Sequence, residues 1–193
     1  MLLNYHADGT ILVYRAYADP ANWPGVSNLE EILPESSPDQ SKGVMDRFYD
    51  YQRGFQMDVT TSDLEKRNLS IIEGAWVDAQ NNGFDTKVFH PERFRMQLPN
   101  QKCSFNLDIA KDVAATVEEA APDRKMRLGM TYAKGNQVVA EGVVSWNRDG
   151  GATESPFISF LLLDEDGMII RERRYQAMDH WPGAENVMAR LGL

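Results

Sequence analysis

The chain has 193 residues, 42% of them hydrophobic and 25% charged, so it carries enough apolar material for a folded core. Its net charge of −9 argues against nucleic acid or an anionic membrane as partner. The longest apolar run, FISFLLL from Phe157, is too short to span a bilayer, and the single cysteine, Cys103, excludes an intramolecular disulfide. A cytoplasmic protein is therefore expected.

The N-terminal end of the chain resembles its C-terminal end. Residues 3–33 align without a gap on residues 161–191, and both copies contain Trp-Pro-Gly, at 23–25 and 181–183. We therefore interpret residues 1–33 as a partial repeat and the polar residues 34–43 as a linker to a complete domain over 44–193. An isolated strand leaves its backbone groups unpaired, so we expect residues 9–17 to join a sheet edge, either in the complete domain or in a dimer partner, with Trp23 at least half buried.

Three helices are predicted next along the chain. Apolar residues recur at three- and four-residue steps over 44–55. A second helix begins at a capping box formed by Ser62 and Glu65 and ends at Asn82-Gly83. After a loop and a short strand over 87–99, a third helix occupies 106–122. The apolar stripes of the second and third helices include Leu64 and Ile109, respectively.

From residue 125 the apolar pattern changes to a period of two, which indicates strands. Four consecutive antiparallel strands are predicted, with turns at Lys134–Asn136 and Asp166-Gly167. The third, SPFISFLLL, is apolar on both faces, as is typical of a covered central strand. The sequence therefore predicts an α+β fold in which about three helices cover one face of a strongly curved antiparallel sheet.

This order of elements, with the ending DEDGMIIRERRYQAMDHWPGAENVMARLGL, resembles the NTF2-like superfamily, in particular its SnoaL-like, polyketide cyclase-like branch. The resemblance covers residues 44–193 and is carried by the Asp166-Gly167 turn, the strand 170–173, the aromatic Tyr175 and the closing Leu191-Gly192. It implies a cystatin-like cone that encloses a pocket, and a homodimer formed through the sheet. Residues 1–33 would then be the last strand and tail of a preceding copy of the same domain.

Enzymes of this superfamily use acid–base catalysis in an apolar pocket. The resemblance places Gln97 or Leu98 where ketosteroid isomerases carry their general-base Asp, and Ser159 near their second acid. SnoaL-type cyclases carry an Asp after the aromatic of the last strand, and here Gln176 follows Tyr175. These neutral residues argue against both specific chemistries.

The remaining polar residues near the end of the last strand are the candidate site. Asp179, His180 and Tyr175 are the candidate catalytic residues, although Asp179 also fits a turn or cap and His180 a polar structural role. The candidate substrate-binding residues are Arg173, Gln176, Trp76, Gln97, Met130 and Trp146. Arg173 is also expected to meet Glu141 across Ser159, either as a structural ion pair or as a ligand clamp.

Two functions fit this sequence. One is a SnoaL-like small-molecule pocket protein, which as an enzyme would be a cofactor-free cyclase, isomerase or dehydratase acting on a small apolar substrate. The alternative is a non-catalytic NTF2-like ligand-binding or assembly module, which the missing carboxylates favour. Neither a metal nor a cofactor is expected, because the three histidines form no close pair and the sequence has no glycine-rich phosphate loop.

Overall fold

The structure, a computed structural model, describes residues 2–5, 11–15, 61–99, 102–148, 150–176 and 181–192. The predicted helix over 44–55, the linker over 34–43 and Trp23 lie outside these residues.

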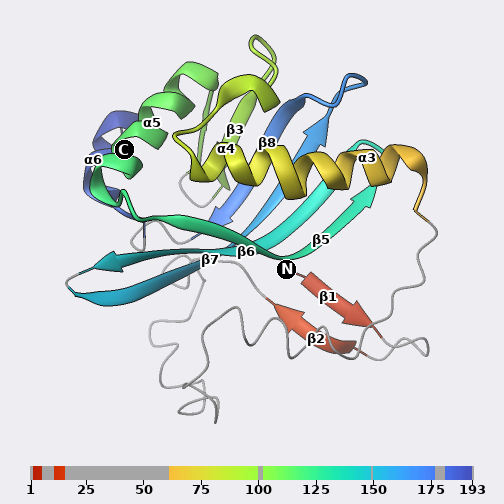
Figure 1. Cartoon of the computed structure of the whole chain (residues 1–193), viewed down its shortest axis with the longest axis horizontal. Helices are drawn as coiled ribbons and strands as arrows, with labels where there is room; N and C mark the ends of the chain where they lie inside the picture. Colours follow the sequence, from red (N-terminus) through yellow and green to blue (C-terminus); the bar gives the residue numbers. More distant parts are fainter. Residues whose placement is uncertain are drawn as a thin grey trace.

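Six strands form one curved sheet in the order β4-β3-β8-β7-β6-β5 (Figure 1). The four predicted strands are β5 (Lys125–Lys134), β6 (Gln137–Arg148), β7 (Gly151–Leu163) and β8 (Ile169–Gln176), each antiparallel to the next. Two short strands extend the sheet beyond β8. β3 (Arg95–Leu98) pairs with β8 in parallel, and β4 (Cys103–Phe105) pairs with β3 antiparallel. The α+β fold is confirmed, and the parallel pairing makes the sheet mixed.

Helices cover the concave side of this sheet (Figure 1). The predicted second helix is a continuous run of α3 (Asp63–Ile71), the π-helix η2 (Ile72–Trp76) and α4 (Val77–Asn81), and it begins at the predicted capping box. The predicted third helix is α5 (Leu107–Ala120). A 3-10 turn η3 (Thr86–Val88) precedes β3, and α6 (Ala184–Leu191), which the sequence did not predict, packs against α5.

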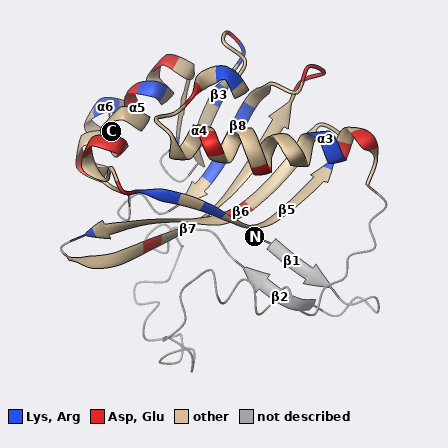
Figure 2. Cartoon of the chain, in the orientation of Figure 1, with Lys and Arg blue, Asp and Glu red and all other residues tan. Residues whose placement is uncertain are grey.

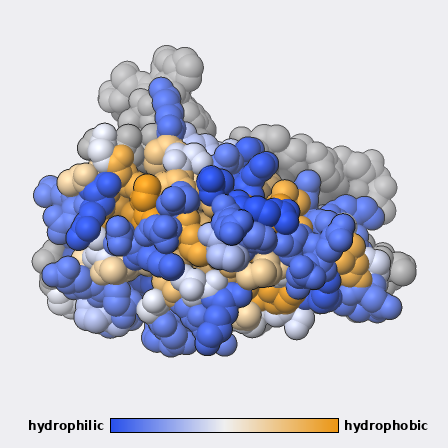
Figure 3. All heavy atoms as spheres, turned by 90° about the horizontal axis from the view of Figure 1, so that it is seen from above, coloured by the Kyte–Doolittle hydropathy of each residue, from blue (hydrophilic) through white to orange (hydrophobic). Residues whose placement is uncertain are grey.

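The apolar core lies between these helices and the sheet. Trp76 of η2 meets Phe157 of β7 edge to face at a centroid distance of 6.3 Å, and both rings are fully buried. Leu64 and Ile109, which were predicted in the helix stripes, are instead 39% and 40% exposed. In α3 the buried positions are Glu65 and Asn68. The helix side of the molecule is accordingly mostly hydrophilic, with apolar side chains visible between the polar ones (Figure 3).

The N-terminal strand has a local partner. β2 (Ile11–Arg15) lies within the predicted strand and pairs antiparallel with β1 (Leu2–Tyr5) in a separate two-stranded sheet. The expected strand is therefore present, but among the described residues it pairs with β1 and not with an edge of the six-stranded sheet; docking on a dimer partner's sheet stays a prediction. Pairing with β1 gives backbone groups of this strand hydrogen-bond partners close by in the sequence.

Charge is unevenly distributed over the elements. Acidic residues outnumber basic ones on α4 and α5, basic residues outnumber acidic ones on β5 and β8, and α3 carries both (Figure 2). Among the described residues, no helix is long and apolar enough to cross a membrane.

The start of α3 is attached to the turn between β5 and β6. The Glu65 carboxylate accepts hydrogen bonds from the backbone N–H groups of Gly135, at 3.0 Å, and Ser62, at 2.9 Å. These backbone donors, first Gly135 and then Ser62, lower the pKa of Glu65 from 4.5 to about 2. Asn68 forms another hydrogen bond to the same turn, because its Nδ2 donates to the Gly135 carbonyl at 2.9 Å.

We predict that Glu65 contributes to the acid sensitivity of the fold. Because its folded-state pKa is below the ordinary value of 4.5, its stabilisation is complete above pH 4.5 and is lost as the pH falls towards about 2. Glu65→Gln should therefore be less stable than the wild type at pH 7, and the difference should shrink as the pH falls through this window. Urea unfolding at several pH values measures this difference in stability. Asp63→Asn is the control, because Asp63 is exposed and forms only a surface ion pair with Lys66. A difference that does not change with pH would contradict the prediction.

Candidate functional site

Alternate residues of β8 face the interior of the cone. Glu172, Arg174 and Gln176 are buried, at 1%, 5% and 7% exposure. The residues between them, Arg173 and Tyr175, are less buried and lie on the opposite face of the strand. The inner face of this strand is therefore polar and charged, which is unusual for a core position.

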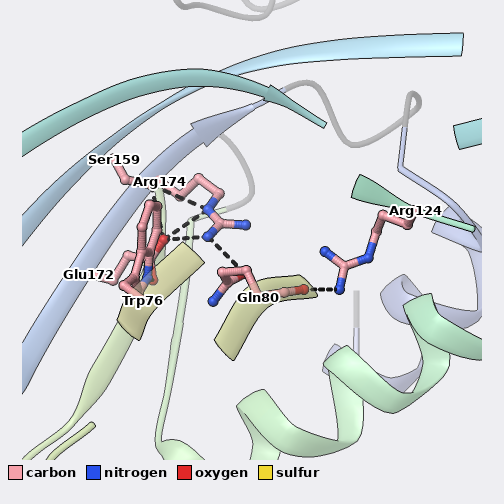
Figure 4. A network of polar contacts seen from close by, with 6 residues as sticks. All are labelled: Trp76, Gln80, Arg124, Ser159, Glu172 and Arg174. Carbon is pink, nitrogen blue, oxygen red and sulfur yellow. Dashed lines mark hydrogen bonds and ion pairs between the residues drawn. The ribbon is translucent and has the colours of Figure 1, made fainter. Parts of the chain in front are cut away.

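Glu172 is the centre of a buried polar network (Figure 4). Its carboxylate accepts from Arg174 Nη2 at 2.6 Å and Nε at 2.8 Å, from Ser159 Oγ at 2.9 Å and from Trp76 Nε1 at 3.3 Å. Ser159 lies opposite Arg174 on the neighbouring strand β7. Trp76 ends the π-helical turn η2, and such single turns are frequent at functional sites. The network thus joins β8, β7 and the helix above them.

Gln80 of α4 connects this network to a second buried arginine. Its side-chain Oε1 accepts from Arg174 Nη2 at 3.2 Å, and its backbone carbonyl accepts from Arg124 Nη2 at 2.5 Å. The two guanidinium groups face each other on either side of Gln80 (Figure 4). Burial and then the positive charge of Arg174 lower the pKa of Arg124, while Glu118, 3.9 Å away, raises it.

These residues border a cavity of about 50 Å³ inside the cone. Its polar end consists of Gln80, Arg124, Arg174 and Gln176. Its apolar walls come from α5, the sheet and the chain before α6, and they are Phe84, Met96, Ala110, Val113, Ala114, Val117, Val144, Trp181 and Pro182. Within the described part of the chain, this lining contains no carboxylate and no imidazole.

Among the described residues, two buried N–H groups that belong to lining residues of this cavity have no hydrogen-bond partner. They are Arg124 Nε and Trp181 Nε1, and both side chains are 8% exposed. An unsatisfied buried donor costs about 1–3 kcal/mol. Both residues line the same cavity, so a ligand acceptor that reached these N–H groups would supply the missing partners.

A groove of about 760 Å³ lies next to the cavity, along the start of α6. Trp146, Asn147 and Arg148 of β6 form one part of its wall. Trp181 and Pro182 line both the groove and the inner cavity. These two residues therefore separate the cavity from the larger hollow.

Three predicted site residues lie on the outer face of the sheet. Arg173 is exposed and donates from Nε to Gln97 Oε1 at 3.1 Å, and Tyr175 packs edge to face on Phe160 at 6.1 Å. The structure brings these residues together, but on the side of β8 opposite the cavity. The expected meeting of Arg173 and Glu141 across Ser159 is corrected by the register, since Ser159 lies between Ala140 and Arg174. Glu141 is one position away, opposite Ile158.

The other predicted residues are spread over four places. Gln176 lines the cavity and donates from Nε2 to Ser155 Oγ at 3.0 Å. Trp76 belongs to the Glu172 network, Trp146 lines the groove, and Met130 lines a surface hollow beside Glu73 and Thr131. Asp179 and His180 lie outside the described residues, so their catalytic role stays a prediction.

Sequence reasoning missed Gln80, Arg124, Arg174 and Trp181 as lining residues. The repeated Trp-Pro-Gly was a signal for Trp181, since Trp181 and Pro182 of this tripeptide border the cavity. Arg124 directly precedes β5, and no local pattern distinguishes it from a surface arginine. Among the described residues, no group of three or more His, Cys, Asp or Glu side chains is placed to hold a metal ion.

We predict that Glu172 is required for stability, because it is the buried counter-charge of Arg174. Glu172→Gln should lower the free energy of unfolding by about 3–5 kcal/mol, since it leaves the guanidinium buried without an anion. Ser159→Ala, which removes a hydroxyl that donates to Glu172 and accepts from Arg174, should cost less, about 1.5–3 kcal/mol, because the ion pair itself remains. Urea unfolding measures both. Equal losses in the two variants would show that the ion pair is not what holds this network together.

Comparisons with known proteins support the fold. No family model matches the sequence, and a search of curated proteins gives no match. A protein from Jannaschia sp. CCS1, provisionally named a SnoaL-like polyketide cyclase, is 17% identical with a TM-score of 0.51, covering 70% of this chain and 97% of its own. A loop-truncation variant of IdmH is 14% identical (TM-score 0.53, covering 59% and 95%). PrhC from Penicillium brasilianum is 8% identical (TM-score 0.54, covering 67% and 91%). The domain therefore has the NTF2-like α+β cone found in SnoaL-like proteins.

Proposed function

We propose that the protein is a SnoaL-like small-molecule pocket protein that binds a small, largely apolar molecule in the cavity under α5. The observation that carries this proposal is the cavity itself, which has apolar walls on most sides and several convergent polar groups at one end. This combination is typical of ligand sites, because apolar walls supply affinity and a few fixed polar groups supply orientation. SnoaL-like proteins with the same fold are named as polyketide cyclases, which agrees with a small-molecule ligand.

The polar end of the cavity is suited to an oxygen atom of the ligand. Arg124 and Trp181 each present an N–H group that lacks a partner, and Arg174 is held in place by Glu172 and Gln80. A ligand oxygen at this end would accept hydrogen bonds from buried side chains, and such bonds are stronger than bonds in water. The Glu172 network then acts as the support that fixes Arg174.

The enzymatic form of the proposal is a cofactor-free cyclase, isomerase or dehydratase that works by acid–base catalysis. Donors fixed at the polar end would stabilise negative charge that develops on a ligand carbonyl oxygen. A proton acceptor is also needed, and Asp179 and His180 immediately precede Trp181 in the sequence. The alternative, a non-catalytic NTF2-like binding or assembly module, is favoured by the described cavity lining, in which there is no carboxylate or imidazole.

We also propose that the protein is a homodimer that pairs through the outer face of its sheet. On this face Phe160 is 40% exposed and packs against Tyr175. A second copy would cover this apolar pair in an isologous interface.

The proposed cavity can be filled from α5. Ala114 lines the cavity and is partly buried, whereas Ala115, the next residue, is exposed. We predict that Ala114→Phe weakens binding of cyclopentanone by about tenfold or more, because the ring occupies ligand space. Ala115→Phe should bind as the wild type does. Saturation-transfer NMR titrations measure both, and equal binding by the two variants would place the ligand elsewhere.

A second experiment separates enzyme from binding module. If Asp179 or His180 is the base, the wild type should accelerate exchange of the α-protons of cyclopentanone in D₂O by about a hundredfold or more. The variants Asp179→Asn and His180→Gln should identify the base by returning exchange to the buffer rate while binding is retained. Binding without acceleration in the wild type would favour the non-catalytic module.

A further inference from the structure

The polar end of the cavity is dominated by hydrogen-bond donors. Arginine and the tryptophan indole can only donate, and Arg124, Arg174 and Trp181 supply three such side chains. Both oxygens of Gln80 already accept, one from each arginine. A molecule that fits here must therefore bring acceptors. The two unpartnered donors, Arg124 Nε and Trp181 Nε1, belong to side chains that are more than nine-tenths buried.

The same end of the cavity has an excess of positive charge. Arg174 is neutralised by Glu172 at 2.6 Å. Arg124 has a weaker counter-charge, because Glu118 is 3.9 Å away and its side chain is 42% exposed, so that water screens it. The described cavity lining contains both arginines and no acid. A buried cation without a close partner is costly, so this site favours a ligand with a negative charge.

The size of the cavity restricts the ligand to a short molecule. A volume of about 50 Å³ is only a few times the roughly 10–15 Å³ that one water needs by this kind of measure. The walls beyond the polar end are aliphatic and aromatic, with Val113, Val117 and Val144 among them. Trp181 and Pro182 also border the outer groove, so a longer chain has a direction in which to extend.

We propose that the cavity binds a short-chain aliphatic carboxylate, whose oxygens accept hydrogen bonds from Arg124 Nε and Trp181 Nε1 and whose alkyl chain lies against the valines of α5 and β6. This inference rests on the proposed function and names the ligand class of the same site. The carboxylate supplies what the site lacks: acceptors for two buried donors and a counter-charge for Arg124.

The test uses three probes of nearly equal shape: butyrate, 1-butanol and butylammonium. Isothermal titration calorimetry on the full chain should show butyrate binding about tenfold or more tighter than 1-butanol, and butylammonium should not bind. Arg124→Gln should remove the preference for butyrate, because the buried positive charge is lost, and should weaken 1-butanol much less. Arg127→Gln is the matched control, because this arginine lies three residues further along the chain, in β5, is exposed and pairs with Glu154, and it should bind as the wild type does.

Two further variants keep the test decisive if Arg124→Gln does not fold. Arg124→Lys keeps the charge but loses the Nε donor, and Trp181→Phe keeps the ring but loses the indole N–H. Each should weaken butyrate several-fold and 1-butanol less, because a hydrogen bond to a carboxylate is stronger than one to a neutral hydroxyl. Equal affinity of the wild type for butyrate and 1-butanol would overturn the carboxylate inference and leave the pocket function standing. Failure of all three probes and of cyclopentanone to bind would overturn both.

Discussion

The buried contact between Glu172 and Arg174 is the interaction on which the interior of this domain depends. An ion pair in a core is stable only when its remaining donors and acceptors are satisfied. Here Ser159 and Trp76 donate further hydrogen bonds to the Glu172 carboxylate. The Gln80 side chain accepts a hydrogen bond from the Arg174 guanidinium. Each of these partners comes from a different element, so the pair also fixes how the helix lies on the sheet.

This arrangement explains why one arginine of the cavity is available for a ligand and the other is not. Arg174 is neutralised by Glu172, and its guanidinium lies 5.7 Å and 5.3 Å from the ring centroids of Trp76 and Phe157, within reach of both π faces. Arg124 is held at its tip by the Gln80 carbonyl but keeps an unpartnered Nε. Arg174 is thus part of the scaffold, and Arg124 is the group that would recognise a ligand.

The fold places a cavity between helices and sheet, but it does not choose a chemistry. Solved structures of similar shape are under 25% identical to this chain, and one cone can support catalysis, binding or assembly. The discriminating features are local: which groups line the cavity, what charge they carry and which of them lack partners. In this chain they point to an electropositive, donor-rich pocket.

The sequence by itself determined most of the secondary structure. The capping box at Ser62, the three- and four-residue periodicity of α5 and the alternation in β5 and β6 are local signals, and the elements follow them. The tertiary structure decided which residues face the cavity. A period of two says that Glu172 and Arg174 share one face of β8 and Arg171 and Arg173 the other, but both faces are charged, so there is no polarity contrast to show which one is inside. Arg124 meets Gln80 across 44 residues, and β3 pairs with β8 across more than 70, so neither contact leaves a local pattern. Those long-range contacts, which exist only once the chain is packed, build the polar end of the cavity.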